Sequence, residues 1–162
     1  MRAFLGVGSN EGDRWGHLAR ALRALRAVPG VAWVRPSSVW ETAPVGPPQP
    51  PYLNAALEAE TGLEAPVLLR AMQEIEAAAG RVRRERWGPR TLDLDLLLLG
   101  DETVDEPGLR VPHPELARRA FVLRPLAELC PERMVPGAGR SVAALLAACP
   151  PQEVRLAGDY PR

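Results

Sequence analysis

Lysine is absent from this chain of 162 residues, so all twenty basic side chains are arginine, and twenty acidic side chains balance them. Zero net charge argues against a general binder of nucleic acid or of membrane surfaces, because both normally carry a basic excess. The Walker A phosphate-binding loop is also excluded, because its G-x-x-x-x-G-K-[ST] pattern requires a lysine.

Cysteine and long apolar runs are scarce as well. Cys130 and Cys149 stand outside any metal-ligand spacing, so we expect both to be reduced thiols. The leucine-rich run at residues 96–99 is far too short to span a bilayer, and the opening segment turns polar too soon for a signal peptide. We therefore expect a cytoplasmic protein without membrane contact, with residues 1–162 forming one domain large enough to bury its own core.

Apolar periodicity predicts a βαββαβ order in the first hundred residues. Four segments have the apolar or alternating pattern of strands, namely residues 2–7, 31–40, 52–61 and 92–99. Leucines at helical spacing follow Asp13, and a second apolar stripe follows Pro66 and ends at Gly80. This order is that of a ferredoxin-like α+β sandwich with both helices on one face of the sheet. We expect additional C-terminal helices at about residues 114–129 and 141–148, where they could cover the other face.

Glycines near the start of the chain do not form a dinucleotide-binding fingerprint. Gly6 and Gly8 begin a G-x-G pattern, but Glu11 stands where the third glycine belongs. We interpret Gly6, Gly8 and Gly12 as a tight connection between the first strand and the first helix, rather than as a phosphate cradle.

Two aspartates stand two residues apart in the fourth expected strand. Because side chains alternate along a strand, Asp93 and Asp95 point to one face and the leucines at 92, 94 and 96 to the other. Neighbouring carboxylates oppose each other's ionisation, and a hard cation such as Mg²⁺ removes that conflict. Two solvated aspartates on a half-exposed strand are the alternative interpretation.

Five arginines lie in the ten-residue segment 81–90, just before these aspartates: Arg81, Arg83, Arg84, Arg86 and Arg90. Each planar guanidinium can bind two oxygens, which suits a polyphosphate. A solvated basic loop and a nucleic-acid contact are the alternatives, although two nearby carboxylates would repel a phosphate backbone without a metal. Arginines beside metal-binding carboxylates favour phosphoryl transfer, where catalysis is chiefly positioning and charge neutralisation.

The third expected strand hints at a flat, polar organic ligand. Tyr52 and Asn54 share one face, which offers a ring for stacking and an amide that can donate and accept hydrogen bonds. Each of these residues could equally serve strand packing. Phe121 taken alone could be a core residue, and His113, between two prolines, could be a solvated loop residue.

Six blocks of the sequence together resemble the 6-hydroxymethyl-7,8-dihydropterin pyrophosphokinase family. They occur in the family's order over nearly the whole chain, and the family's fold is a ferredoxin-like core with added helices. The blocks are Gly8-Ser-Asn, Ser38-Val-Trp-Glu-Thr-Ala-Pro-Val-Gly, Gln49-Pro-Pro-Tyr-Leu-Asn, Gly80-Arg-Val-Arg, Arg86-Trp-Gly-Pro-Arg-Thr-Leu-Asp-Leu-Asp-Leu-Leu, and Pro112-His-Pro with Arg119-Ala-Phe.

The resemblance implies transfer of pyrophosphate from ATP to the pterin hydroxymethyl group, giving AMP. It implies catalytic roles for Arg81, Arg90, Asp93 and Asp95, with the two aspartates holding two Mg²⁺ ions. It implies pterin contacts for Thr42, Val45, Tyr52, Asn54, Trp87 and Phe121. It implies contacts with ATP, the co-substrate, for Glu76, Arg81, Arg83, Arg90, Leu96, Arg110, His113 and Arg119.

Two alternatives to this activity stay open at this point. A non-catalytic module of the same fold could bind nucleotide or pterin without turnover. A sheet that binds single-stranded nucleic acid would need exposed aromatic residues on its strands, and here only Tyr52 is suitably placed. We expect a monomer whose partners are small-molecule substrates and not nucleic acid.

The dense prolines of residues 47–51 should restrict the motion of a segment that the family uses as a lid.

Overall fold

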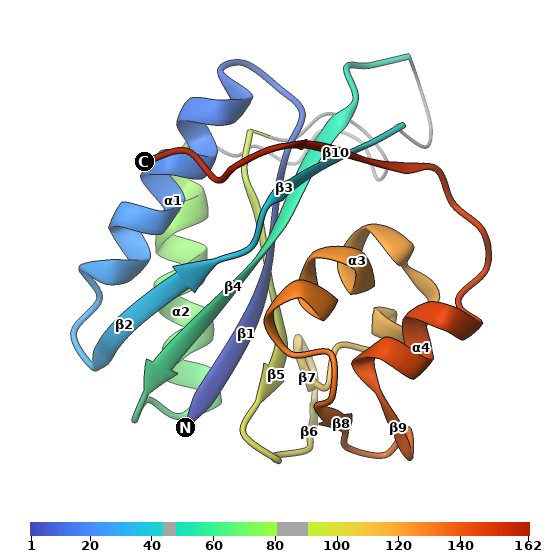
Figure 1. Cartoon of the computed structure of the whole chain (residues 1–162). Helices are drawn as coiled ribbons and strands as arrows, with labels where there is room; N and C mark the ends of the chain where they lie inside the picture. The colour runs from blue at the N-terminus through green and yellow to red at the C-terminus, as the bar shows by residue number, and fades with distance from the viewer. Residues whose placement is uncertain (44–47, 81–90) are drawn as a thin grey trace.

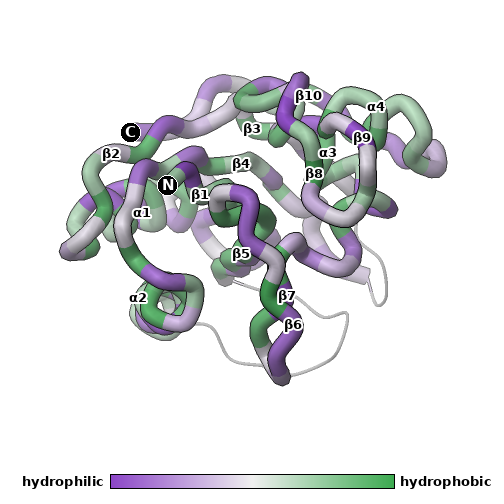
Figure 2. The backbone as a smooth tube through the Cα atoms, turned by 90° about the horizontal axis from the view of Figure 1, so that it is seen from below, coloured by the Kyte–Doolittle hydropathy of each residue, from purple (hydrophilic) through white to green (hydrophobic). Residues whose placement is uncertain are grey.

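Helices cover both faces of an antiparallel sheet in the computed structural model, which describes residues 1–43, 48–80 and 91–162. The helices α1 (Arg14–Arg26) and α2 (Ala65–Ala78) lie on one face, and α3 (Ala120–Leu129) and α4 (Val142–Ala148) lie on the other (Figure 1). Viewed from below, β1, β4 and β5 run between the two helix pairs (Figure 2). The prediction that the C-terminal helices cover the second face is confirmed.

Within the described ranges, no helix is long and apolar enough to cross a bilayer.

The sheet has the strand order β10-β3-β4-β1-β5, and β2 also pairs with β4. Its strands are β1 (Arg2–Ser9), β2 (Val31–Pro36), β3 (Val39–Thr42), β4 (Tyr52–Thr61), β5 (Asp93–Leu99) and β10 (Val154–Gly158). The strand predicted at residues 31–40 is divided after Pro36, which has no N–H to donate. The prediction for residues 52–61 is confirmed over its full length.

The C-terminal third contains more strand than the sequence predicted. The helix expected over residues 114–129 is a short 3-10 turn, η1 (Leu116–Arg118), followed by α3, because the backbone of Arg119 is extended between them. The second expected helix is correct, with Ser141 as the N-cap of α4. Two hairpins were missed, β6 (Val104–Glu106) with β7 (Leu109–Val111) and β8 (Met134–Val135) with β9 (Arg140–Ser141). The edge strand β10 was also missed.

Two apolar clusters flank the sheet because the side chains of its central strands alternate between the faces. Leu53 and Leu57 of β4 pack with Leu68 and Met72 of α2 on one side. On the other side Ala56 packs in the cluster that contains Leu123 and Val142 of α3 and α4. Both faces of β4 are thus covered, which fixes the register of the strand.

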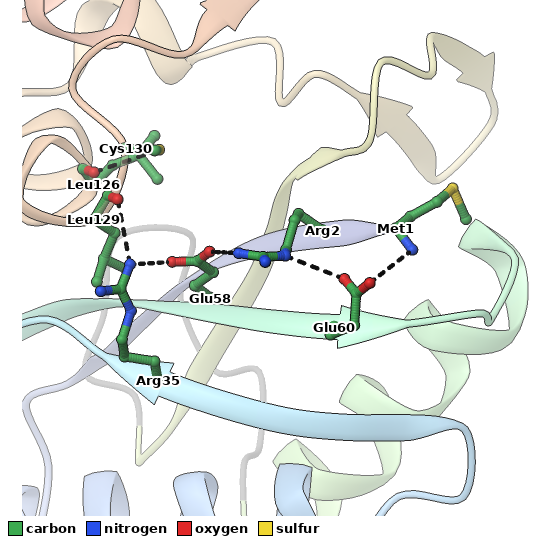
Figure 3. A network of polar contacts seen from close by, with 8 residues as sticks. All are labelled: Met1, Arg2, Arg35, Glu58, Glu60, Leu126, Leu129 and Cys130. Atoms are coloured by element: carbon green, nitrogen blue, oxygen red, sulfur yellow. Dashed lines mark hydrogen bonds and ion pairs between the residues drawn. The ribbon is translucent and has the colours of Figure 1, made fainter.

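A charged network closes the end of the sheet where β1 begins (Figure 3). The side chain of Glu58 on β4 is only 4% exposed, and its carboxylate accepts hydrogen bonds from Arg2 at 2.6 Å and Arg35 at 2.5 Å. Arg35 also donates to the carbonyl of Leu129 at the end of α3. Glu58 therefore connects β1, β2 and β4 on the face that α3 covers.

We expect Glu58→Gln to lower the free energy of unfolding by about 1–3 kcal/mol, because the amide keeps only one of the two acceptor oxygens and loses the charge that pairs with both arginines. Glu60→Gln is the matched control, since Glu60 lies on the same strand and contacts Arg2 at 3.3 Å but is 39% exposed. An exposed ion pair contributes only about 0–1 kcal/mol. Urea denaturation of both variants measures the difference, and equal losses would contradict the assignment.

Candidate active site

A cavity of about 420 Å³ opens at the end of the sheet where β1 finishes and β4 and β5 begin, on the side of α3. It combines acidic, aromatic, amide and cationic groups from strands and helices that are far apart in sequence. Its lining includes Gly6, Gly8, Thr42, Tyr52, Asn54, Asp93, Asp95, Glu115, Arg118, Arg119, Phe121 and Gln152. The structure thus brings together seven residues that the sequence predicted for one site: Thr42, Tyr52, Asn54, Asp93, Asp95, Arg119 and Phe121.

Glycines stand directly across the sheet from both aspartates. Asp93 pairs with Gly8 and Asp95 pairs with Gly6 in the register of β1 and β5. Because residues opposite each other share a face, the missing side chains leave open space beside the two carboxylates. Gly6 and Gly8 therefore line the cavity within β1, and the interpretation of these two glycines as a strand-to-helix connection is wrong. Gly12, whose φ is +71°, does lie in the turn before α1.

Asn54 is held in one orientation at the floor of the cavity. Its Nδ2 donates a hydrogen bond to Oγ1 of Thr42, and both residues are buried. On its other side lies Gly8, where an added Cβ atom would stand 3.0 Å from Oδ1 of Asn54. The amide therefore presents Oδ1 beside Gly8, and Tyr52 follows in the same wall.

The opposite wall of the cavity is the start of α3. Phe121 lies in the first turn of the helix, and the guanidinium of Arg119 stands 5.6 Å from the centre of its ring. An arginine over an aromatic ring is a favourable contact, and it keeps a positive charge beside an apolar surface. This wall thus offers both a flat ring and a cation to a ligand.

His113 lies beside the carboxylates and is neutral. Burial lowers the pKa of its imidazole most, the charge of Arg119 lowers it further, and Glu115 and Asp93 raise it less. Its Nδ1 accepts a hydrogen bond from the Glu115 N–H at 3.1 Å, so the proton of the neutral ring belongs on Nε2. Nε2 stands 3.9 Å from a carboxylate oxygen of Asp95, so its N–H lies beside that carboxylate.

We expect an NMR titration of the metal-free chain to give His113 a pKa below its ordinary value of 6.5. Arg119→Gln should raise this pKa yet leave it below 6.5, because burial is the larger cause. His17 is the internal control, since its lowered pKa arises from burial and from Arg20 and should not respond to the change at position 119. A His113 pKa above 6.5 in the unmodified chain would contradict the neutral assignment.

Four described residues that were predicted to contact ATP are not part of the lining of this cavity: His113, Glu76, Leu96 and Arg110. Glu76 is buried, and its carboxylate accepts a hydrogen bond from the Leu94 N–H at 2.9 Å. The side chain of Leu96 packs in the core between the sheet and the helices α1 and α2, so a contact with ATP would have to use its backbone. Arg110 lies on the β6–β7 hairpin, where it pairs with Asp105 at 3.2 Å.

Five predicted site residues lie outside the described residues: Val45, Arg81, Arg83, Trp87 and Arg90. Their assignments therefore stay predictions from the sequence.

Asp93 and Asp95 suit a hard divalent cation, because both supply carboxylate oxygens to the cavity and neither has a cysteine beside it in the lining. Among the described residues, no group of three or more metal-binding side chains occurs. An ion held by these two aspartates would therefore complete its coordination with water and with oxygens of a bound phosphate.

Sequence reasoning missed three kinds of residue in this site. Gly6 and Gly8 could have been found from their spacing of two, which places both on one face of β1. Asn10 donates to Oε1 of Gln49 at 2.7 Å and to the Pro50 carbonyl at 3.1 Å, which ties the proline segment to the turn after β1. Gln152 gave no local signal, since only folding brings it to the cavity.

Comparison with known proteins gives a family for the chain. The family model described as 7,8-dihydro-6-hydroxymethylpterin-pyrophosphokinase (HPPK) matches residues 4–131. A protein of Pseudomonas aeruginosa is 44% identical over 93% of this chain and 93% of its own length. One from Bacillus subtilis is 46% identical over 79% of this chain and 77% of its own length. Both are named 2-amino-4-hydroxy-6-hydroxymethyldihydropteridine pyrophosphokinase.

Solved structures with similar folds include wild-type HPPK-DHPS of Plasmodium falciparum, with a TM-score of 0.70 and 12% sequence identity. The same protein with STZ-DHP gives a TM-score of 0.71. This chain is covered to 91% in both matches, and it spans only 44% and 43% of those longer chains. At this identity the likeness establishes the mixed α/β fold, while the family follows from the sequence matches. The chain belongs to the 7,8-dihydro-6-hydroxymethylpterin-pyrophosphokinase family.

Proposed function

We propose that this chain transfers pyrophosphate from ATP to the hydroxymethyl group of 6-hydroxymethyl-7,8-dihydropterin, giving the pterin pyrophosphate and AMP. The observation that carries the proposal is the single cavity in which the carboxylates of Asp93 and Asp95 meet the ring and amide groups of Phe121, Tyr52 and Asn54. Membership in the pyrophosphokinase family and relatives above 40% identity support the same activity.

The pterin occupies the half of the cavity between β4 and α3. Its flat ring fits between the aromatic side chains of Tyr52 and Phe121, while Asn54 hydrogen-bonds its polar edge. Because Thr42 fixes the amide of Asn54, this contact is oriented before the substrate arrives. Such preorganisation lowers the entropy that binding must lose. Val45 and Trp87 complete this half in the proposal.

The phosphates occupy the half of the cavity around Asp93 and Asp95, which hold two Mg²⁺ ions in the proposal. Bound Mg²⁺ neutralises phosphate charge and favours ionisation of the attacking hydroxyl. On this chain, the Nε2–H of His113 and the guanidinium of Arg119 are placed to donate to phosphate oxygens. Arg81, Arg83, Arg90 and Arg110 are further phosphate ligands, with Arg81 and Arg90 on the transferred group.

The reaction is a direct displacement. The pterin hydroxyl oxygen forms a bond to the β-phosphorus of ATP, and the bond from that phosphorus to the bridging oxygen of AMP breaks. The protein holds the attacking oxygen in line with the bond that breaks and excludes water from that bond. No side chain needs to form a covalent intermediate.

We also propose that the core of the sheet is ferredoxin-like. In that sandwich the first strand lies at the centre beside the third and fourth, and here β1 lies between β4 and β5, while β2 and β3 pair with the other edge of β4. Residues 1–162 form one catalytic domain, and the chain acts as a monomer in the cytoplasm.

The test is to incubate the purified chain with ATP, Mg²⁺ and 6-hydroxymethyl-7,8-dihydropterin and to quantify AMP by chromatography. The proposal predicts AMP only when all three are present. A non-catalytic binding module would bind both substrates and leave ATP intact. A nucleic-acid-binding sheet would bind single strands and neither substrate.

A further inference from the structure

The first turn of α3 lacks an N-terminal cap of its own. The N–H groups of Val122 and Leu123 both reach the Arg119 carbonyl, at 3.0 and 2.9 Å, so Ala120 and Phe121 at the helix start need another acceptor. The N-cap residue is Arg119, whose side chain has donors only and makes no capping bond. The first helical amides normally find an acceptor on a side chain or in water.

Gln152 supplies that acceptor from a segment 31 residues further along the chain. Its Oε1 accepts a hydrogen bond from the backbone N–H of Phe121 at 3.3 Å. The same side chain lines the cavity beside Phe121 and Arg119. Because the N–H can only donate, the bond requires Oε1 rather than Nε2 on the helix side.

The backbone around Gln152 is anchored on both sides. Two residues later, Val154 begins β10 and pairs with Thr42, the residue that fixes Asn54. Further on, the buried Tyr160 donates its hydroxyl to the carbonyl of Leu18 in α1 at 2.6 Å. Figure 1 shows this C-terminal segment running from α4 along β3 toward α1. Gln152 is therefore carried by a segment that is tied to the sheet and to the helices of both faces.

We infer that Gln152 is a positioning residue for the pterin half of the site, acting by capping α3 and so fixing Phe121. This inference rests on the proposed function. Gln152 lies outside residues 4–131, the part that matches the family model. The C-terminal segment thus helps to fix the position of Phe121 in the site.

The test compares Gln152→Met with Gln152→Glu. Methionine keeps the length of the side chain but cannot cap, whereas a glutamate carboxylate accepts the same hydrogen bond and suits a helix N-terminus. We expect Gln152→Met to raise the pterin Kd by up to roughly five- to tenfold, the factor reached if the bound pterin must repay the whole cost of the lost N-cap to order Phe121. The pterin Kd of Gln152→Glu should stay close to that of the unmodified chain. The Kd values are measured by calorimetry with a non-hydrolysable ATP analogue and Mg²⁺, and the nucleotide Kd measured alone should not change.

Hydrogen exchange at Phe121 and the pterin Kd together distinguish capping by Gln152 from a general effect of the substitution. Faster hydrogen exchange at the Phe121 amide in Gln152→Met, with protection restored in Gln152→Glu, supports the cap. Gln73→Met, on the exposed side of α2, is the control and should leave the pterin Kd unchanged. Equal pterin affinity in Gln152→Met and the unmodified chain overturns the inference, and so does an equal loss in Gln152→Met and Gln152→Glu.

The unmodified chain tests the proposed function separately in the same series. If it forms AMP while Gln152→Met keeps the pterin affinity of the unmodified chain, then only the inference fails. If it forms no AMP, then the proposed function fails, and the hydrogen exchange at Phe121 still tests the cap.

Discussion

Asp95→Asn should lower kcat by roughly a thousandfold or more if Asp95 holds metal as proposed, because loss of a ligand to a catalytic metal removes several kcal/mol of transition-state stabilisation. The amide has the shape of the carboxylate but lacks its charge. Asp93→Asn should behave alike, since both carboxylates line one cavity and face glycines across the sheet. The fold should persist, because both aspartates are only half-buried and such replacements typically change stability by less than about 1 kcal/mol.

Steady-state kinetics over a range of Mg²⁺ concentrations measure this effect. Asp101→Asn is the matched control, because Asp101 follows β5 closely but its side chain is 98% exposed and outside the cavity. Turnover near that of the unmodified chain in either Asp93→Asn or Asp95→Asn would contradict the assignment of the metal ligands.

Gly8→Ala should raise the pterin Kd roughly ten- to hundredfold, because displacing a buried hydrogen-bonding group costs about 1–3 kcal/mol. A Cβ atom at position 8 would stand 3.0 Å from Oδ1 of Asn54. The amide must shift by a few tenths of an ångström to relieve this contact, which disturbs the orientation set by its bond to Thr42. The nucleotide Kd should change much less, since the clash lies in the pterin half.

Gly6→Ala is the companion variant for this prediction. A Cβ atom at position 6 has as its nearest neighbour the side chain of Leu97 at 3.7 Å, an ordinary van der Waals contact. Calorimetry should therefore show a smaller loss of pterin affinity than in Gly8→Ala. A loss in Gly6→Ala equal to or greater than that in Gly8→Ala would contradict the proposed role of the Asn54 orientation.

Local patterns predicted the parts of the fold that local forces decide. The leucines after Asp13 predicted α1, because one buried face of a helix leaves a regular spacing of apolar residues. The alternation of Tyr52–Thr61 predicted β4, although both faces of that strand are buried. The same alternation put Asp93 and Asp95 on one face. It could not show that Gly8 and Gly6 stand opposite them, because pairing between β1 and β5 joins residues more than eighty positions apart.

Two site features depend on tertiary contacts that leave no local pattern. Residues 154–158 form a short, largely exposed strand whose partner, β3, lies more than a hundred residues earlier. Glu76 is buried on the same helix as Leu68 and Met72, and no local pattern in the sequence indicated its partner. Its burial follows from the backbone N–H of Leu94, which needs an acceptor at the side of β5 that faces α2.

The most direct test of the central claim follows the phosphorus atoms of ATP. The chain is incubated with Mg²⁺, 6-hydroxymethyl-7,8-dihydropterin and ATP labelled at either the α- or the γ-phosphorus, and the products are separated. Pyrophosphate transfer predicts the α label in AMP and the γ label in the pterin product, in equal amounts. Label in ADP and a pterin monophosphate, or no transfer to pterin by a folded chain that binds both substrates, would contradict the account.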